Sequence, residues 1–211
     1  YGLTKGQYSA TVEKGSRKRK AEENRQNPID LCAMAINLGC SFVARSFSGS
    51  KKQLTALIKA AMSHRGIAVI DVISPFVTFA NHDEFFRSYG YVKDNETELH
   101  SPDYIPHHTP VEEVDIPAGE YQDIELFDGA TLRLETVGDE YDPSDAMAAL
   151  AAIHKAEVDK MHVTGLLYFD ADQATLDEEL SLSDTPLVDL SDDELRPSEQ
   201  ALADLLAEFR S

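Results

Sequence analysis

The run IAVIDVIS at residues 67–74 constrains the fold most, because it is almost continuously apolar and rich in β-branched side chains. Such runs are typical of a strand that is buried on both faces of a parallel sheet. A second β-rich run, SFVARSF, lies at residues 41–47. The segment between the two runs has apolar side chains at helical spacing. We therefore predict a strand–helix–strand crossover in an open, mostly parallel α/β sheet.

Two helices are predicted beside these strands. The helix at residues 28–39 has Pro28 in its first turn and ends at Gly39. The other lies within residues 48–66, with a serine cap and an end at Gly66. Their expected apolar faces hold Leu31, Cys32, Ile36 and Leu38 in the first helix, and Leu54, Leu57, Ile58, Ala61 and Met62 in the second. Ligands of open α/β sheets bind at the carboxyl ends of the strands. Residues 45–48 and 74–77 are therefore expected near any site.

The pattern changes after Pro75. Residues 80–110 show little periodicity and are predicted to be irregular. Residues 120–137 alternate around Asp128-Gly129, which indicates a hairpin with a two-residue turn. A helix is expected at 144–160 with Ser144 as its cap, a strand at 163–170, and a last helix from Ser198. That last helix places Leu202, Leu205 and Leu206 on one face.

The charge of the chain is uneven. Its net charge is −19, yet residues 1–70 hold 12 Lys and Arg against 4 Asp and Glu, whereas residues 71–211 hold 7 against 34. The acidic excess disfavours a nucleic-acid partner, so the basic run at 17–20 is expected to be solvated or to contact a phosphate or cofactor. The positive first third could face an anionic ligand. No apolar run approaches the roughly 20 residues that span a bilayer, which excludes a membrane partner, and a cytoplasmic location is expected.

Motifs for metal or nucleophilic chemistry are weak. His100, His107 and His108 cluster with Asp103, but we favour a surface loop over a metal site there. Cys32 and Cys40 have no zinc or redox spacing and are expected to be reduced and buried. His154 and His162 are expected on or after a surface helix. No G-x-S-x-G nucleophile turn is present in the sequence.

Two stretches are candidates for function. YGLTKGQ, residues 1–7, combines small residues that permit close backbone approach with a hydroxyl and one cation. SPFVTFANH, residues 74–82, is a polar turn at the end of the apolar strand. Together with FVARSFSGSKKQL, YDPSDAMAAL, VTGLLYFD and LRP, these strings resemble the β subunit of 2-oxoacid:ferredoxin oxidoreductases, especially the 2-oxoglutarate type.

The resemblance implies a domain organisation and an activity. Residues 1–80 would be the C-terminal part of a thiamine-diphosphate-binding α/β domain, and residues 81–211 a C-terminal extension of α+β type. The implied enzyme oxidatively decarboxylates a 2-oxoacid, passes the acyl group to CoA and the electrons to ferredoxin, and works with an α subunit. The cofactor carries the hard chemistry, and the protein supplies positioning and electrostatics.

The resemblance assigns roles to residues 1–7. Tyr1, Gly2, Leu3, Gly6 and Gln7 are expected to bind the cofactor, with Leu3 against the substrate side chain. Lys5 is expected to reach a carboxylate or phosphate, and Thr4 to offer a hydroxyl hydrogen bond, so these two are the catalytic candidates. In the family, Mg²⁺ is held by a Gly-Asp-Gly turn and by residues just before the Tyr-Gly pair, which implies an N-terminal piece upstream of this chain.

Phe76 departs from the family pattern. A cysteine that ligates a [4Fe-4S] cluster usually occupies this position, and a phenyl ring cannot ligate iron. Neither Cys32 nor Cys40 sits at a family ligand position. We therefore expect a modified or absent cluster. The alternative function is a non-catalytic interaction or assembly fragment of such a complex, in which the long acidic extension makes subunit contacts.

Overall fold

The computed structural model describes residues 8–16, 22–75, 86–109, 121–136, 141–196 and 198–209. The chain divides into two compact units, Tyr1–Gln173 and Ala174–Ser211. Sequence positions 1–7, 17–21 and 76–85 lie outside the described residues. The predictions for the YGLTKGQ stretch, the basic run and Phe76 therefore stay predictions.

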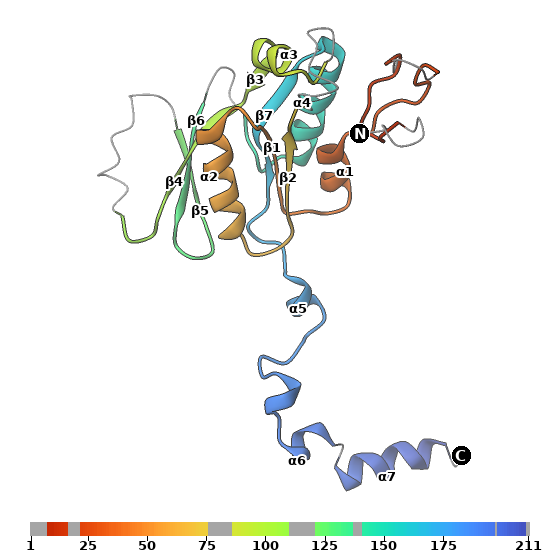
Figure 1. Cartoon of the computed structure of the whole chain (residues 1–211). Helices are drawn as coiled ribbons and strands as arrows, with labels where there is room; N and C mark the ends of the chain where they lie inside the picture. The colour runs from red at the N-terminus through yellow and green to blue at the C-terminus, as the bar shows by residue number, and fades with distance from the viewer. Residues whose placement is uncertain are drawn as a thin grey trace. The chain divides into compact units, whose positions relative to one another are not determined.

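A four-stranded sheet forms the centre of the first unit (Figure 1). Its strands are β1 (Phe42–Phe47), β2 (Ala68–Ile73), β3 (Glu96–Glu98) and β7 (His162–Phe169), in the order β2-β1-β7-β3. The pairs β1–β2 and β3–β7 are parallel, and the pair β1–β7 between them is antiparallel. The prediction of a mostly parallel α/β sheet is thus confirmed.

Helices cover both faces of this sheet. The helices α1 (Leu31–Asn37) and α4 (Ala146–Asp159) lie together on one face. On the other face α2 (Lys51–Met62) lies between the main sheet and a second, antiparallel sheet (Figure 1). That second sheet has the order β4-β6-β5, with β4 (His100–Ile105), β5 (Tyr121–Glu125) and β6 (Thr131–Thr136).

Two apolar clusters hold these layers together. One joins Phe42 and Leu57 to the second sheet, and the other joins Cys32 and Val43 to α4 and β7. Strand β1 is buried along its whole length because it has a strand on each side and helices on both faces. Strand β2 is only partly buried, and Val72 is 38% exposed, so the prediction of a fully buried strand is wrong. Among the described residues β2 is an edge strand, which leaves its side chains less covered.

The helix faces and caps differ in detail from the predictions. Asp30, and not Pro28, begins α1, because its carboxylate accepts a hydrogen bond from the Ala33 backbone N–H. Likewise Asp145, and not Ser144, caps α4. The buried face of α2 consists of Gln53, Ala56, Leu57 and Ala60. Of the predicted apolar face, Ile58 and Met62 are exposed, and so are Leu31 and Leu38 of α1.

The hairpin around Asp128-Gly129 is confirmed, with a longer turn than predicted. The Leu126 N–H donates to the Ala130 carbonyl, and the Gly129 N–H donates to the Leu126 carbonyl. Gly129 has a φ of +77°, which is the left-handed conformation of a three-residue hairpin loop with a glycine bulge. Arg133 and Asp123 join the two strands through paired contacts of 2.7 and 2.6 Å.

Residues 86–109 are more regular than predicted. They form α3 (Tyr89–Asp94), β3 and β4. Ser88 caps α3 by accepting a hydrogen bond from the Tyr91 N–H. Pro102 is tolerated in β4 because this strand lies at the edge of its sheet. Strand β7 also pairs with β1 across the predicted boundary at residue 80, so one sheet contains strands from both sequence regions.

The second unit holds short helical segments: α5 (Leu176–Glu179), η3 (Leu187–Asp189), α6 (Asp192–Leu195) and α7 (Glu199–Glu208). Thr175 and Ser191 each form a capping box, and Ser198 caps α7. These segments contain no buried residue. Within the described ranges, no helix has both the length and the apolar content needed to cross a bilayer.

Candidate functional site

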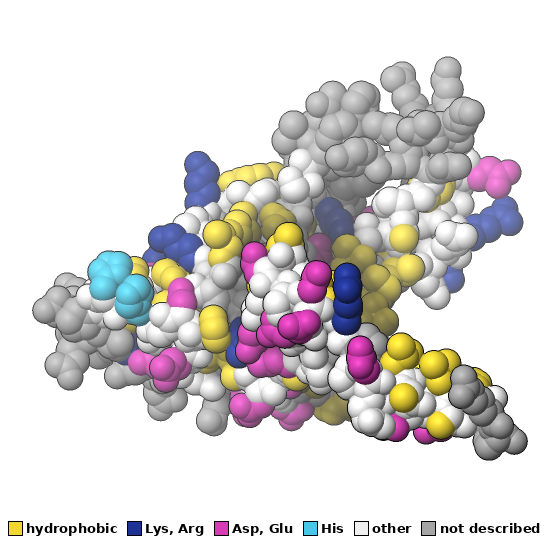
Figure 2. Space-filling view, turned by 90° about the horizontal axis from the view of Figure 1, so that it is seen from below, with side chains coloured by type: hydrophobic (Ala, Val, Ile, Leu, Met, Phe, Trp, Pro, Cys, Tyr) yellow, Lys and Arg dark blue, Asp and Glu magenta, His cyan; other side chains and the backbone are white. Residues whose placement is uncertain are grey.

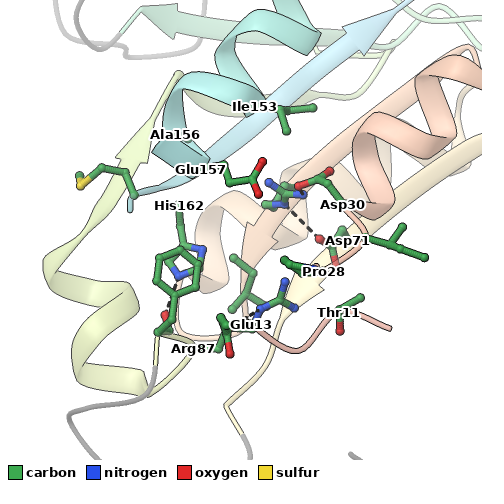
Figure 3. A pocket seen from close by; sticks show the side chains of 15 residues that line it. Thr11, Glu13, Pro28, Asp30, Asp71, Arg87, Ile153, Ala156, Glu157 and His162 are labelled. Carbon is green, nitrogen blue, oxygen red and sulfur yellow. Dashed lines mark hydrogen bonds and ion pairs between the residues drawn. The ribbon is translucent and has the colours of Figure 1, made fainter. Parts of the chain in front are cut away.

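A pocket with a volume of about 110 Å³ lies in the first unit, beside Arg45 of β1 and Asp71 of β2 (Figure 3). It is lined by Thr11, Glu13, Pro28, Ile29, Asp30, Arg45, Asp71, Ile73, Phe86, Arg87, Ile153, Ala156, Glu157, Met161 and His162. Of residues 45–48, which were predicted near any site, Arg45 alone lines this pocket, and the prediction stays a prediction.

A buried ion triad forms one wall of the pocket. Arg45 Nη2 lies 2.6 Å from Asp30 Oδ2, and Arg45 Nε lies 3.0 Å from Asp71 Oδ2. The strand register places Arg45 directly opposite Asp71, while Asp30 comes from the start of α1. Burial opposes the charge of the guanidinium, but the Asp30 and Asp71 carboxylates beside it raise the pKa of Arg45. Arg45 therefore stays charged and fastens α1 to two strands.

Glu13 and Arg87 form a second, looser pair at the pocket. Arg87 Nε lies 3.5 Å from Glu13 Oε1, and both side chains are about one-third exposed. Neither of these two atoms has a hydrogen-bond partner among the described residues, although both atoms are buried. The two side chains thus line the pocket without a short polar contact between them.

His162 forms the opposite side of the pocket, and it follows the surface helix α4 as predicted, although its side chain is buried at the start of β7. Its Nε2 lies 2.7 Å from the Phe86 carbonyl oxygen, so Nε2 carries the proton and donates it. Burial lowers the pKa of His162, and the nearby Arg87 and Arg45 add to that shift. The ring is therefore neutral at pH 7 and held in one tautomer, and its centroid lies 4.1 Å from that of the Phe86 ring, with the two planes tilted by 46°.

The charges and size of the pocket limit what it can bind. Glu13, Asp30, Asp71 and Glu157 supply four carboxylates, against the guanidinium groups of Arg45 and Arg87. Binding of a diphosphate requires positively charged surroundings or a metal ion. Pockets that bind small molecules and cofactors have volumes of roughly 300–1,000 Å³. The described residues of this pocket therefore do not fit thiamine diphosphate by themselves.

The histidines that were weighed as a metal site, and for which a surface loop was favoured, do not all lie together. His100 is a buried residue of β4, whereas His107 and His108 contact each other, with ring centroids 5.3 Å apart. The described ranges contain no group of three or more His, Cys, Asp or Glu side chains that could hold a metal ion. The surface-loop prediction is right for His107 and His108 and wrong for His100, which lies in a strand.

Cys32 and Cys40 are free and buried, as predicted. Burial raises the pKa of Cys32 to about 12, so its thiol is protonated and unreactive at neutral pH. The Cys32 thiol lies 3.6 Å from the Ala44 carbonyl. Both cysteines belong to the apolar cluster between α1, β1 and α4, which does not offer them to a metal cluster.

One serine–histidine contact was not predicted. Ser41 Oγ lies 2.8 Å from His64 Nε2, the spacing of a nucleophile and its base. Ser41 is only 1% exposed, and the His64 ring lies against Phe42 and Phe169. A substrate could not reach the Ser41 hydroxyl, so the contact serves to join the end of α2 to β1.

The comparisons with known proteins agree with the resemblance seen in the sequence. Residues 1–72 match the C-terminal TPP-binding domain of thiamine pyrophosphate enzymes. The chain is 38% identical over 109 residues to the 2-oxoacid:ferredoxin oxidoreductase subunit beta of a Sulfolobus species, which covers 50% of this chain and 34% of the relative. It is 45% identical over 99 residues to subunit beta of 2-oxoacid:ferredoxin oxidoreductase 1 of Aeropyrum pernix, a match that covers 46% of this chain and 31% of the relative. It is also 32% identical over 132 residues to the 2-oxoglutarate synthase subunit KorB of Methanocaldococcus jannaschii, covering 59% and 47%.

A solved structure shows the same fold. The 2-oxoglutarate:ferredoxin oxidoreductase from Magnetococcus marinus, with 2-oxoglutarate, coenzyme A and succinyl-CoA bound, aligns with a TM-score of 0.55 and 23% identity. The alignment covers 86% of this chain and 47% of that chain. This chain is thus similar to 2-oxoacid:ferredoxin oxidoreductase β subunits and spans about a third of the length of the first two relatives named above.

Proposed function

We propose that this chain is part of the β subunit of a thiamine-diphosphate-dependent 2-oxoacid:ferredoxin oxidoreductase that acts on 2-oxoglutarate. The observation that carries the proposal is the match of residues 1–72 to a TPP-binding domain, because that range contains YGLTKGQ and the parallel β1–β2 pair. The names of the relatives support the reaction, and the 2-oxoglutarate synthase relative supports the substrate.

The proposed reaction removes CO₂ from the 2-oxoacid, transfers the acyl group to CoA and passes the electrons to ferredoxin. Thiamine diphosphate would supply the stabilised carbanion for this chemistry. The contribution of this chain is to position the substrate through residues 1–7. Lys5 would pair with the distal carboxylate of 2-oxoglutarate as a point charge, and Thr4 would donate a hydroxyl hydrogen bond.

We expect the magnesium ion and the diphosphate to be bound outside the described pocket. The acidic character of the described pocket supports this assignment, because four carboxylates surround two guanidinium groups there. The Arg45 triad would hold the first turn of α1, which follows the N-terminal segment in sequence, against the two parallel strands.

The electron-transfer part of the proposal includes a modified iron–sulfur site. Phe76 occupies the position at which the family has a cysteine, and both described cysteines are buried in an apolar cluster. Iron and acid-labile sulfide analysis of the complete complex, with electron paramagnetic resonance, tests this part. An ordinary four-cysteine cluster signal would contradict it.

Substrate choice is tested with Lys5→Ala in the complete enzyme complex. We expect kcat/KM to fall more for 2-oxoglutarate than for pyruvate, because only 2-oxoglutarate has a distal carboxylate. Lys14→Ala is the matched control, since Lys14 is an exposed lysine beyond the YGLTKGQ stretch. Equal losses for both substrates in the Lys5 variant would reject the distal-carboxylate role.

The cofactor assignment is tested by calorimetry with thiamine diphosphate and Mg²⁺. We expect the complete complex to bind the cofactor and the 211-residue chain to bind it poorly. Micromolar binding by the chain alone would show that the site is not split. Failure of the complete complex to bind would reject thiamine chemistry and leave the alternative of an assembly subunit, which the exposed apolar side chains of residues 174–209 would favour.

A further inference from the structure

Residues 174–209 form helical segments that bury none of their apolar side chains. Each of the three α-helices there has a hydroxyl residue at its start, namely Thr175, Ser191 and Ser198. Such caps stabilise helices locally, without help from tertiary packing. The large hydrophobic side chains nevertheless lie between 47% and 88% exposed: Leu176, Leu180, Leu182, Leu187, Val188, Leu195, Leu202, Leu205, Leu206 and Phe209. We call residues 174–211 the acidic arm, because they hold 11 Asp and Glu against 2 Arg.

The longest helix of the acidic arm has one apolar face. Leu202, Leu205, Leu206 and Phe209 follow the i, i+3, i+4, i+7 spacing of a single helical stripe. Its acidic residues Asp204 and Glu208 lie outside that stripe, and Glu199 lies at the edge of the stripe, one turn before Leu202. Figure 2 shows hydrophobic side chains at the surface of this segment, with acidic side chains nearby. A complementary partner would offer an apolar stripe with positive charges along its edges.

The outer face of α2 has this complementary character. Ile58 is 43% exposed and Met62 is 83% exposed, one helical turn apart on the same face. Three exposed lysines, Lys51, Lys52 and Lys59, accompany them along the helix. With 12 residues, α2 is about 18 Å long, and the 10 residues of α7 span about 15 Å. The two helices therefore match in length as well as in chemistry.

The lysines of α2 are held only by surface contacts. Lys52 Nζ lies 3.3 Å from Asp103 Oδ2, and that lysine side chain is 74% exposed. Lys59 Nζ lies 5.6 Å from the centre of the Tyr104 ring. Exposed pairs of this kind contribute at most about 1 kcal/mol. The lysines can therefore turn toward the carboxylates of an incoming helix at small cost.

We propose that α7 in the acidic arm of one copy of this chain docks along α2 of a second copy. The opposite charges of residues 1–70 and 71–211 favour such complementarity between copies. In a two-fold dimer the exchange is reciprocal, so both arms bind at once and reinforce each other. The inference does not depend on the proposed catalytic function.

Disulfide trapping in the full chain tests the proposal. One copy carries Met62→Cys and a differently tagged copy carries Leu206→Cys, and the two are mixed at low salt. The native cysteines do not interfere, because both are buried. We expect a cross-link between the two tagged copies at least about tenfold above the controls, as a raised effective concentration predicts. The yield should fall in 1 M NaCl, where the Debye length is only about 3 Å.

Two controls use exposed positions that the proposal excludes. Met147→Cys on α4 replaces the Met62 position, and Gln200→Cys on the polar side of α7 replaces the Leu206 position. A charge test adds Lys52→Glu and Lys59→Glu to the copy with Met62→Cys, and these changes should abolish the cross-link. Adding Glu199→Lys and Glu208→Lys to the copy with Leu206→Cys should then restore the cross-link. Yields equal to the controls would overturn the proposal. A further variant carries Met62→Cys and Leu206→Cys in one chain. A cross-link within that chain, with none between the two tagged copies, would overturn the proposal as well. So would a cross-link yield that does not respond to the charge reversals.

Discussion

Replacing Arg45 with methionine tests whether the buried triad fastens α1 to the sheet. Methionine keeps much of the length of the side chain but removes the charge and both contacts, at 2.6 Å to Asp30 and 3.0 Å to Asp71. The Asp71 carboxylate then has no cation beside it, and its side chain is only 12% exposed to water. Removing one partner of a buried ion pair leaves an uncompensated charge, which costs about 3–5 kcal/mol.

The exposure of the two carboxylates decides how the loss in Arg45→Met divides between them. The Arg45 side chain is 8% exposed, so only water that enters the adjoining pocket can replace the lost contacts. Asp30 is 31% exposed and can recover part of its hydration. Its carboxylate also accepts a hydrogen bond from the Ala33 backbone N–H, a contact that the substitution leaves in place. Most of the loss therefore comes from Asp71.

The free energy of unfolding is measured in urea for the wild-type chain, Arg45→Met, Arg45→Met with Asp71→Asn, and Lys52→Met. The double variant should regain much of the loss, because it removes the orphaned charge as well. Lys52 is the control, since its pair with Asp103 has side chains 74% and 40% exposed. Its removal should cost no more than about 1 kcal/mol.

The result that would refute this reasoning is an Arg45→Met variant no less stable than Lys52→Met. Such a result would mean that water reaches Asp71 in the folded chain, so that the charge of Arg45 is not needed there. A double variant as unstable as Arg45→Met would point to lost packing around the side chain instead of an unpaired carboxylate.

Three further predictions concern pH, capping and backbone conformation. Burial lowers the pKa of His100 from 6.5 to about 4, so the unfolded chain binds the proton first and stability falls as the pH drops from 6.5 to 4. The loss should reach about 3 kcal/mol across that window. Urea titrations at several pH values should show that His100→Leu removes this pH-dependent loss of stability and that the exposed control His154→Leu leaves it unchanged. Asp145→Ala should cost about 1 kcal/mol, because the Asp145 carboxylate accepts hydrogen bonds from two backbone N–H groups of α4. Ser50→Ala should be nearly neutral in the same assay, since Ser50 makes no capping bond at α2. Gly129→Ala should cost roughly 1–2 kcal/mol through its φ of +77°, and less destabilisation than that would show that the hairpin turn rearranges.

The elements that the sequence predicted correctly are those with strong local patterns. Strands β1 and β2 and helices α2 and α4 have apolar spacing that spans the whole element. The hairpin depends on one turn, and Gly129 supplies the left-handed conformation that this turn needs. Such signals depend on neighbouring residues alone, so they survive without knowledge of the rest of the fold.

The elements between residues 86 and 109 could not be predicted because their stability comes from distant strands. The three residues of β3 have no apolar pattern and pair with residues 162–164 of β7. His100 and Pro102 are poor strand residues, yet β4 forms because every residue of it lies opposite a residue of β6. Long-range pairing overrides weak local preference in both cases.

The pocket was only partly predictable, although the sequence contained a usable signal. Each of the two six-residue strands β1 and β2 has a single charged residue, Arg45 and Asp71, at its fourth position. A charge inside an apolar strand needs a partner, because burying it alone is costly. Parallel strands joined by one helix are commonly neighbours, and equal positions in them lie side by side. The pair Arg45–Asp71 therefore follows from strand lengths and register. Asp30 and His162 do not, because α1 and β7 reach the pocket through the packing of both sheet faces, which local patterns do not specify.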